Sequence, residues 1–531
     1  MTSSLSRRAY AVILFLILVV CYGYFLPKWA DWGANSRANL VYAVGDKGVL
    51  YIDDYHTNTG DLACYPGPYT PAANPEDKTG GSCEGHFYTD KSIGPSLLAL
   101  PFYIVFKGVA ALPPVQNLIS NAGSLGSMAD TLNPDGQGAQ PQAVYEYMAL
   151  TFITFFASAV PSAFLAVVIF FFACRFANKD SYAFVLALAY GLGTMAFPYS
   201  NALYQHQLAS VGTFLGFFLL WRVVYEQANV AWLWLVGVLF SFVVITEYPV
   251  VPMLGVIFLW ALYKIPNRIA LYRVVLAAIP LGLLFAAYNY AIFQTPLPAG
   301  YEYSTNWQGE HQTGFFSLVL PTADRLYGLT FSPVRGIFVM SPFLLLSFGG
   351  FYLMWKERRD QRSTWLMFLF VIAGFFFYNS ASEMWWGGFT VGPRYLVPML
   401  PFVTIPIIFA FNRLFVHLGG RLVGALLVLA SIFSVAIMTI GGQGWPPVNE
   451  WPLTINQMNA SFPLVDYSLP LVIEGNVARN YGMFVGLKGL FSLIPLLVVV
   501  GVLLSLLLGL LRRSTRQTNF SASKLKIVRE A

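Results

Sequence analysis

The chain has 531 residues, of which 57% are hydrophobic and only 11% are charged. Soluble domains carry about 25% charged residues, so a globular core has no room for this much apolar surface. Lipid must therefore be the solvent for most of the chain, which makes an integral membrane protein the expected class. The formal net charge of +6 does not indicate nucleic-acid binding, because most Lys and Arg residues lie in short loops beside apolar runs.

Twelve apolar runs of about 17–25 residues follow one another along the chain, each long enough to cross a bilayer as a helix. The first run starts after Arg7-Arg8 and has no small-residue cleavage site behind it, so we interpret it as an uncleaved span. The expected fold is an all-α integral membrane bundle with both termini on one side. The predicted spans cover residues 9–27, 147–173, 182–198, 207–224, 231–246, 249–264, 273–293, 337–355, 364–380, 396–412, 422–441 and 489–511.

Basic residues fall in alternate loops between these spans, which indicates that those loops and both termini are cytoplasmic. The alternation holds only if the apolar run from Ser96 to Leu112 does not cross the membrane. We therefore expect an external helix lying along the membrane there, entered after Pro95 and ended near Pro113-Pro114. The alternative is an extra span at this point, which would place the basic loops outside.

This topology predicts one transmembrane domain over residues 1–513 and a basic cytoplasmic tail over residues 514–531. The external part is mainly a long first loop, residues 28–146, and a last loop, residues 442–488. Most connections in proteins are short, and long ones are usually functional or disordered. We therefore expect the site on the extracytoplasmic face of the cell membrane, in an inner or plasma membrane.

Four cysteines occur in the chain, and two of them fall in the first loop. Cys21 and Cys174 lie inside apolar runs, where a thiol is inert. Cys64 and Cys83 flank a stretch rich in Pro and Gly. If the first loop faces an oxidising compartment, these two are candidates for a disulfide, although spacing alone does not prove the geometry.

The first loop also carries acids and a lysine of the kinds that group-transfer chemistry uses. A carboxylate can take a proton from an acceptor hydroxyl, and a cationic group can hold a phosphate. Lys91 is the first candidate for a phosphate contact. A solvated polar loop with structural salt bridges is the alternative. The candidate bases are Asp53, Asp54, Asp61 and Asp90.

Two arginines lie at the external ends of predicted spans, where basic residues are otherwise rare. Arg335 precedes the eighth span and Arg394 precedes the tenth. An arginine at the lipid boundary is costly unless it faces a cavity or an anion. Together with Lys91, the two arginines could clamp a phosphate or pyrophosphate. The alternative is that each one reaches out to lipid headgroups.

Other polar and aromatic residues are expected at the same depth. His206 opens the fourth span, and Glu247 lies in the tight turn between the fifth and sixth spans, where a carboxylate is a functional candidate. Both could equally be satisfied packing groups. Tyr303 and the pair Trp385-Trp386 could stack on sugar rings, or belong to an interfacial aromatic belt.

The run His86-Phe87-Tyr88-Thr89-Asp90-Lys91, followed by Gly94-Pro95, resembles the first external loop of lipid-phosphate-dependent glycosyltransferases with the multi-spanning GT-C fold. In those enzymes an aromatic-acid-Lys-Pro-Pro motif contacts the donor phosphate. The resemblance covers most of the chain and is to the bacterial protein-mannosyltransferase and aminoarabinose-transferase group. Its further matches are Arg37, Ile52-Asp53, Asp61, Tyr288-Asn289-Tyr290, Ser332-Pro333-Val334-Arg335-Gly336 and Gly392-Pro393-Arg394-Tyr395.

The resemblance implies a GT-C-like bundle that moves a sugar, a hexose or a pentose, from a polyprenyl phosphate to a lipid, polysaccharide or protein outside the cytoplasmic membrane. It implies that Lys91, Arg394, Arg335 and Arg37 hold the donor phosphate, with Tyr88 beside them. No nucleic acid is expected as a partner. No cofactor is called for by the sequence, and a divalent metal ion stays open.

The chain departs from that family at one place. The better-known members carry an Asp-Glu pair just ahead of an arginine like Arg37, and that Asp is their candidate base. Here the matching stretch is Ala34-Asn35-Ser36, which has no carboxylate, and Asp31 lies slightly earlier. The base would then be Asp53, Asp54 or Asp61, or the chemistry would differ.

Two other functions stay open from the sequence. A transporter or flippase for lipid-linked sugars would also need cationic grips on phosphate, but it predicts charged residues buried in the middle of spans. The predicted spans are almost free of such charges, and the polar groups gather on one face, which favours a one-sided enzyme. The missing Asp-Glu pair also leaves open a GT-C-like scaffold that binds lipid without catalysis.

Overall fold

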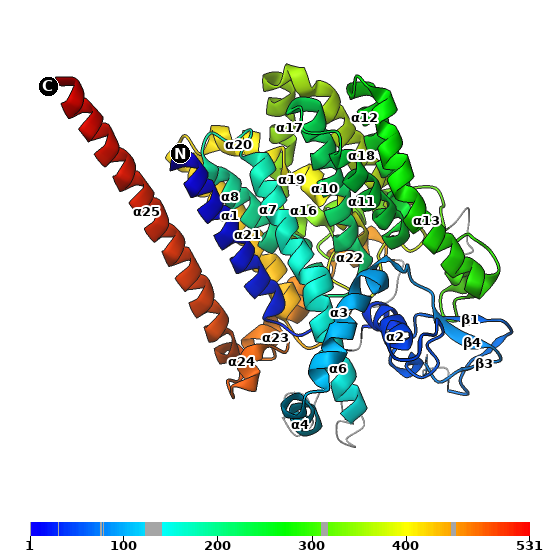
Figure 1. The fold of residues 1–531 in the computed structure, drawn as a ribbon. Coiled ribbons are helices and arrows are strands. Elements are labelled where there is room, and N and C mark those ends of the chain that lie inside the picture. Colours follow the sequence, from blue (N-terminus) through cyan, green and yellow to red (C-terminus); the bar gives the residue numbers. More distant parts are fainter. Residues whose placement is uncertain are drawn as a thin grey trace.

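The computed structural model describes residues 2–29, 31–74, 77, 79–122, 141–309, 317–447 and 453–530. Its long helices form a bundle, in which α1 (Thr2–Gly23) begins and α25 (Ile494–Glu530) ends at the same end (Figure 1). The opposite end holds α2 (Trp32–Lys47), α4 (Pro113–Ala122) and four short strands. We call this opposite end the polar end, because the charged cavity lies there.

Seven helical runs are long and apolar enough to cross a membrane, and two bent pairs raise this number to as many as nine within the described ranges. The bent pairs are Gly94–Ala110 with Pro113–Asn121, at 95°, and Arg394–Thr404 with Ile407–Leu414, at 50°. The protein is therefore a mostly helical, multi-pass membrane protein. The seven runs contain α1, α6 (Pro141–Thr154) with α7 (Val160–Ala173), α10 (Gln205–Tyr225), α13 (Tyr272–Phe293), α18 (Arg362–Ala381), α21 (Leu418–Ile440) and α25.

Besides the bent pair Arg394–Thr404 with Ile407–Leu414, four of the twelve predicted spans are short or interrupted helices in the structure. Proline accounts for part of this difference, because a proline has no N–H to donate and fits best in the first turn of a helix. Pro249 and Pro342 each stand at such a restart. The helices concerned are α8 (Asp180–Gly193) with α9 (Ala196–Ser200), α11 (Trp232–Thr246), η3 (Tyr248–Val250) with α12 (Val251–Lys264), and α16 (Ile337–Met340) with η6 (Pro342–Leu345) and α17 (Leu346–Glu357).

The first loop contains strands that the sequence analysis did not anticipate. Strand β1 (Leu62–Tyr65) pairs antiparallel with β4 (His86–Thr89), and Leu62 lies opposite Thr89. A second short pair joins β2 (Tyr69–Thr70) to β3 (Ser82–Cys83). Cys64 and Cys83 form a disulfide, with their Cα atoms 5.7 Å apart. Because β1 and β4 run antiparallel, the residue before β1 and the residues after β4 lie side by side.

Helix α3 (Gly94–Ala110) begins close behind β4 and stands against the turn that follows α11. Pro95 occupies its first turn, where the missing N–H costs nothing. A Cβ atom on Gly94 would lie 2.0 Å from Oγ1 of Thr246, so only glycine fits this contact. Beyond Ala110 the chain turns by 95° into α4, which starts at Pro113.

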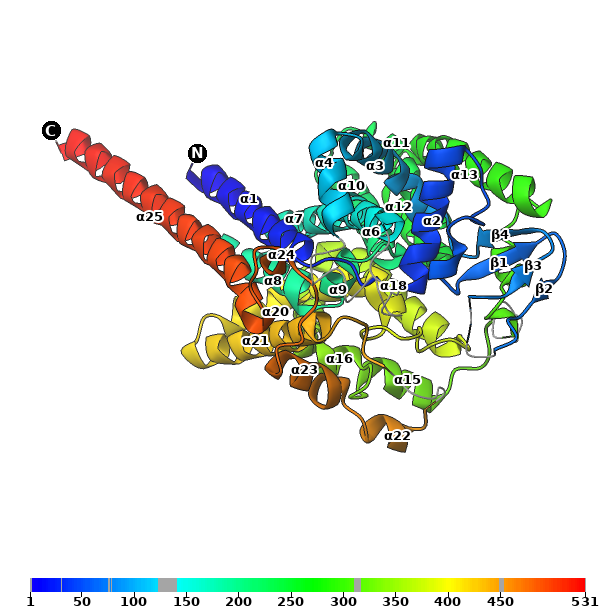
Figure 2. The ribbon, with the colours of Figure 1, turned by 90° about the horizontal axis from the view of Figure 1, so that it is seen from below.

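The polar end is built from segments that are far apart in the sequence. Viewed from below, α2, α3 and α4 occupy one side, and α15 (Ala323–Thr330), α22 (Ile455–Asn459) and α23 (Leu469–Ile473) occupy the other (Figure 2). The last loop, residues 442–488, therefore faces the first loop across this end. Their facing segments form part of the wall of the cavity.

The outermost helices present apolar side chains to their surroundings. Only 6% of the most apolar stretch of α25 is buried inside the protein, and only 22% of that of α13. Side chains such as Leu283 and Leu497 are exposed on these helices. Exposed apolar surface of this extent is stable in lipid and not in water.

Candidate functional site

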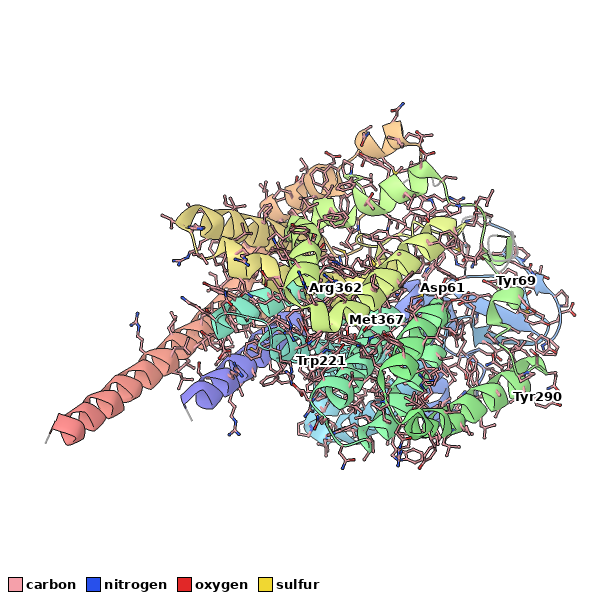
Figure 3. All side chains as sticks on the ribbon, turned by 90° about the horizontal axis from the view of Figure 1, so that it is seen from above. Asp61, Tyr69, Trp221, Tyr290, Arg362 and Met367 are labelled. Carbon is pink, nitrogen blue, oxygen red and sulfur yellow. A yellow bond between two sulfur atoms is a disulfide. The ribbon has the colours of Figure 1, made fainter. Side chains whose placement is uncertain are left out.

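A cavity of about 1440 Å³ opens at the polar end. Its wall combines acids, bases and aromatic rings from the first loop, the start of α10, the turn after α11, residues 298–307, the end of α18 and the last loop. Asp61 lies toward the middle of the molecule, whereas Tyr69 and Tyr290 lie near its edge (Figure 3). The lining residues used below are Asp31, Arg37, Asp61, Lys91, Tyr204, Gln205, Glu247, Tyr301, Glu302, Tyr303, Trp307, Trp386, Arg394, Tyr395 and Trp445.

The paired strands bring Asp61, Asp90 and Lys91 together. Asp61 directly precedes β1, and Asp90 and Lys91 directly follow β4. The Lys91 Nζ lies 3.2 Å from Oδ2 of Asp61 and 3.1 Å from Oδ1 of Asp90. Asp61 and Lys91 line the cavity, whereas the Asp90 side chain is fully buried behind them and accepts from Ser304 Oγ.

Helix α2 is tied to both strands through one hydroxyl. Ser36 Oγ donates to the backbone carbonyl of Asp61 at 2.7 Å and lies 2.7 Å from Oγ1 of Thr89. Ser36 is completely buried, so neither bond competes with water. The helix that carries Arg37 is therefore held in register with the strands that carry Asp61 and Lys91.

Lys91 is shared by the two acids Asp61 and Asp90, and the pKa values of Lys91 and Asp90 are both raised. Burial opposes the charge of Lys91, but Asp61 and Asp90 outweigh it and the pKa of Lys91 is raised. Burial is also the main influence on Asp90, and together with repulsion from Asp61 it raises the pKa of Asp90 to about 6, against the attraction of Lys91. The group carries one excess negative charge when all three are ionised, and the raised pKa of Asp90 makes its carboxyl a site where a proton can be taken up.

Arg37 is a buried cation whose hydrogen bonds go to neutral groups. Its guanidinium donates to the carbonyl of Gly33 and to Oε1 of Gln205, and its Cζ lies 5.7 Å from the centre of the Tyr204 ring. Its Nε has no hydrogen-bond partner. Within the described parts of the chain, no carboxylate lies within salt-bridge distance of Arg37.

Arg394, which is far from Arg37 in the sequence, also contacts the ring of Tyr204. Its Cζ lies 5.2 Å from the centre of the Tyr204 ring and 5.1 Å from that of Tyr395. Its Nη2 lies 3.4 Å from the Tyr395 hydroxyl, and its Nε has no hydrogen-bond partner. As with Arg37, no acid pairs with it in the part of the chain that the structure describes. Two cations of the cavity wall are thus left uncompensated.

Arg335 was predicted to hold the donor phosphate, but the structure places it outside the cavity wall. It is completely buried and donates to the carbonyls of Gly388 and Gly392 and to Oγ1 of Thr390. The backbone of Gly388 and Gly392 has positive φ values of 75° and 59°, which glycine adopts readily. Arg335 therefore holds the loop that delivers Arg394.

His206 and Glu247 form a buried pair at the inner wall. His206 Nδ1 lies 2.6 Å from Oε2 of Glu247, and the His206 side chain is completely buried. Glu247 lies in the break between α11 and η3 and lines the cavity. The structure thus brings together two residues that the sequence analysis named separately.

Several predicted residues do not reach the cavity. Asp53 accepts from the backbone N–H of Phe87 and contacts His86, and Asp54 pairs with Lys47 at the surface. Tyr88 packs against Phe293. Trp385 is buried beside Gly328, so of the adjacent tryptophans only Trp386 lines the cavity. These positions remove Asp53 and Asp54 from direct contact with a ligand in this cavity.

Asp31 lines the cavity and lies outside the predicted set of candidate bases. Its Oδ1 accepts from the Tyr204 hydroxyl at 2.6 Å and from the N–H of Ala34 at 3.2 Å, and its Oδ2 accepts from Nε1 of Trp445 at 2.8 Å. The N–H of Ala34 belongs to the first turn of α2, so Asp31 is the N-cap of that helix. In the sequence, an Asp ahead of a helix indicates an N-cap. No local pattern predicts that Trp445, which is far away in the chain, donates a hydrogen bond to this Asp.

Aromatic rings complete the wall on the side of residues 298–307. Tyr303 stacks on Phe293 with the ring centres 5.5 Å apart, and Trp307 donates from Nε1 to Oδ1 of Asp61 at 2.9 Å. The centre of the Tyr301 ring lies 5.5 Å from Nζ of Lys91. Flat rings next to acids and bases suit a ligand with apolar ring faces and hydroxyl edges.

The acids of the cavity do not gather around one point. Over the described ranges, no group of three or more His, Cys, Asp or Glu side chains is arranged to hold a metal ion.

In comparisons with known proteins, no family model and no curated protein matches the chain. The fold and the site therefore define the class: a multi-pass helical membrane protein with a large, charged, aromatic cavity at one end of its bundle.

Proposed function

We propose that this protein is a membrane glycosyltransferase of the GT-C type. It moves a sugar from a polyprenyl phosphate to an acceptor on the extracytoplasmic face of the cell membrane, with inversion at the anomeric carbon. The observation that supports this proposal most is the pair Arg37 and Arg394, two cavity arginines that have no carboxylate partner among the described residues.

An unpaired arginine away from water is expensive, because its charge loses solvation and gains no opposite charge in return. Two such arginines around one ring also repel each other. An anion between them would relieve both costs. A phosphate suits this place, since a guanidinium offers donors in a planar fork that matches two phosphate oxygens.

Lys91, which directly follows β4, is proposed to assist the two arginines. An ammonium group has three donors, and Asp61 and Asp90 take two of them. The third is left for a ligand oxygen. Because both acids already balance its charge, Lys91 contributes less to holding the phosphate than the two arginines do.

The aromatic wall is proposed to hold the sugar. Trp307 and Trp386 line the cavity, and Tyr303 is fixed by its stacking on Phe293. Rigid rings of this kind cover the apolar faces of a sugar, while the nearby acids accept from its hydroxyl groups. The apolar lipid tail would then extend toward the membrane-facing helices.

Native mass spectrometry of the detergent-purified protein tests this proposal. We expect the wild type to retain an isoprenoid phosphate, and Arg37→Ala and Arg394→Ala to lose it. Arg413→Ala is the matched control, because Arg413 is exposed and pairs with Glu357 away from the cavity. Retention of ordinary phospholipids alone by the wild type would contradict a polyprenyl-phosphate donor and favour a scaffold or a transporter.

A further inference from the structure

The pair of Glu247 and His206 offers a carboxylate oxygen to the cavity. Glu247 lines the cavity, and its Oε2 is occupied by Nδ1 of His206. In the described structure its Oε1 accepts no hydrogen bond and pairs with no Lys or Arg. This oxygen is the part of Glu247 that is left to meet a ligand.

Two other carboxylates that line the cavity, those of Asp61 and Asp31, have both oxygens occupied by hydrogen-bond or salt-bridge partners. In Asp61, Oδ1 accepts from Trp307 and Oδ2 pairs with Lys91. In Asp31, Oδ1 accepts from Tyr204 and Oδ2 accepts from Trp445. Because these oxygens are already engaged, less of their accepting capacity is left for the proton of an acceptor hydroxyl.

Two remaining acids are less suited than Glu247 for other reasons. Asp90 does not line the cavity, and its side chain is fully buried behind Lys91. Glu302 lines the cavity but is exposed to solvent, so water competes for its oxygens. Glu247 alone among these acids combines burial, access to the cavity and an unoccupied oxygen.

We infer that Glu247 is the base that takes the proton from the acceptor hydroxyl, and that His206 is its positioning residue. This inference rests on the proposed glycosyl transfer. As the acceptor oxygen bonds to the anomeric carbon, the bond from that carbon to the donor phosphate oxygen breaks and its electron pair leaves with the phosphate. The acceptor proton goes to Oε1 of Glu247.

His206 is built to hold Glu247 in one orientation. Rings of Tyr199, Tyr204 and Tyr395 surround its imidazole, with centres 6.0, 5.9 and 5.2 Å away. Its Nε2 is buried and has no hydrogen-bond partner, so Nδ1 is the atom through which it acts. A ring fixed in this way holds Oε2 of Glu247 and leaves Oε1 as the oxygen that can meet a ligand in the cavity.

Turnover of a defined donor tests the inference. A panel of synthetic undecaprenyl-phosphate hexoses and pentoses is offered to the full-length protein, with an alkyl glycoside detergent as the hydroxyl acceptor, and released undecaprenyl phosphate is measured. We expect Glu247→Gln to lower kcat by about 100-fold or more, the usual contribution of a general base. Native mass spectrometry should show unchanged donor retention, since Gln still accepts from Nδ1 of His206.

Variants of His206 separate positioning from simple packing. Asn places an amide N–H close to the position of Nδ1, so His206→Asn should keep most of kcat, whereas His206→Phe fills the space without a donor and should lower kcat by about 10-fold with little change in KM. Equal losses of kcat in both variants would overturn the positioning role.

The same experiment distinguishes a wrong assignment of the base from a wrong proposed function. Full kcat in Glu247→Gln, with a large loss in Asp31→Asn or Asp61→Asn, would overturn the assignment of the base and leave glycosyl transfer standing. Absence of both donor retention and turnover in the wild type would overturn the proposed function and this inference with it.

Discussion

Arg37 and Arg394 lie 357 positions apart in the chain and meet at one aromatic ring, with their guanidinium carbons 5.7 and 5.2 Å from the centre of Tyr204. The hydroxyl of the same tyrosine donates to Asp31 at 2.6 Å. Tyr204 thus joins two cations and one acid of the cavity, and it offers a way to separate their contributions.

Substitutions of Tyr204 should separate the ring from the hydroxyl. Each cation–ring contact contributes about 0.5–2 kcal/mol, so Tyr204→Leu should weaken retention of an isoprenoid phosphate by roughly 2-fold to 30-fold per contact. Tyr204→Phe keeps the ring and removes only the bond to Asp31, so retention should stay near that of the wild type. Quantitative native mass spectrometry measures both, and equal losses in the two variants would contradict a role for the ring.

The charge balance around Lys91 predicts a large effect of its removal. Lys91→Met leaves Asp61 and Asp90 buried without their cation, which should destabilise the protein by about 3–5 kcal/mol. Adding Asp90→Asn removes one of the two stranded charges and should restore part of the loss. Thermal unfolding in detergent measures both, with Lys47→Met as a surface control that should leave the Tm nearly unchanged.

The raised pKa of Asp90 predicts how stability depends on pH. Between the ordinary carboxyl pKa, about 4, and the value of about 6 caused by burial, the folded state holds a proton that the unfolded state has released. Stability should therefore fall as the pH rises through this window. Asp90→Asn removes the titrating group, so its Tm should fall less than that of the wild type between pH 4 and pH 7. Parallel Tm curves for the two proteins would contradict the assignment.

The disulfide should support the part of the site that β1 and β4 carry. It joins residues 19 positions apart, for which a loop-closure contribution of about 3 kcal/mol is expected. Cys64→Ser should lower the Tm and open the loop between β1 and β4 to proteolysis. A reductant should have the same effect on the wild type and none on the variant. An additional effect of the reductant on Cys64→Ser would show that another thiol is responsible.

Two glycines of α3 form a matched pair for the contact with the turn after α11. At Gly94 an added methyl group would meet Thr246, so Gly94→Ala should destabilise the protein by about 1–3 kcal/mol and displace Lys91. At Gly108 there is open space, and Ala there should stabilise the helix by up to about 1 kcal/mol. Thermal unfolding compares the two, and equal effects would contradict the close approach.

Part of this protein follows from composition and pattern alone. The scarcity of charge and the length of the apolar runs predict a helical membrane protein, because lipid accepts only backbones that satisfy their own hydrogen bonds. The run from Tyr88 to Lys91 marks the first loop as chemically unusual. The strands β1 and β4 escaped prediction, since four-residue segments are shaped by the partner they pair with and by the disulfide.

The tertiary structure decided which charged residues share a cavity. Arg37 and Arg335 were both predicted to contact the donor phosphate. In the structure Arg37 lines the cavity, whereas Arg335 donates its hydrogen bonds to the carbonyls of Gly388 and Gly392. Asp53 lies close to Asp61 in the chain but bonds elsewhere, while His206 and Glu247 come together over 41 positions. These outcomes depend on which hydrogen bonds are satisfied when distant helices pack, and a local pattern of residue types carries no record of such packing.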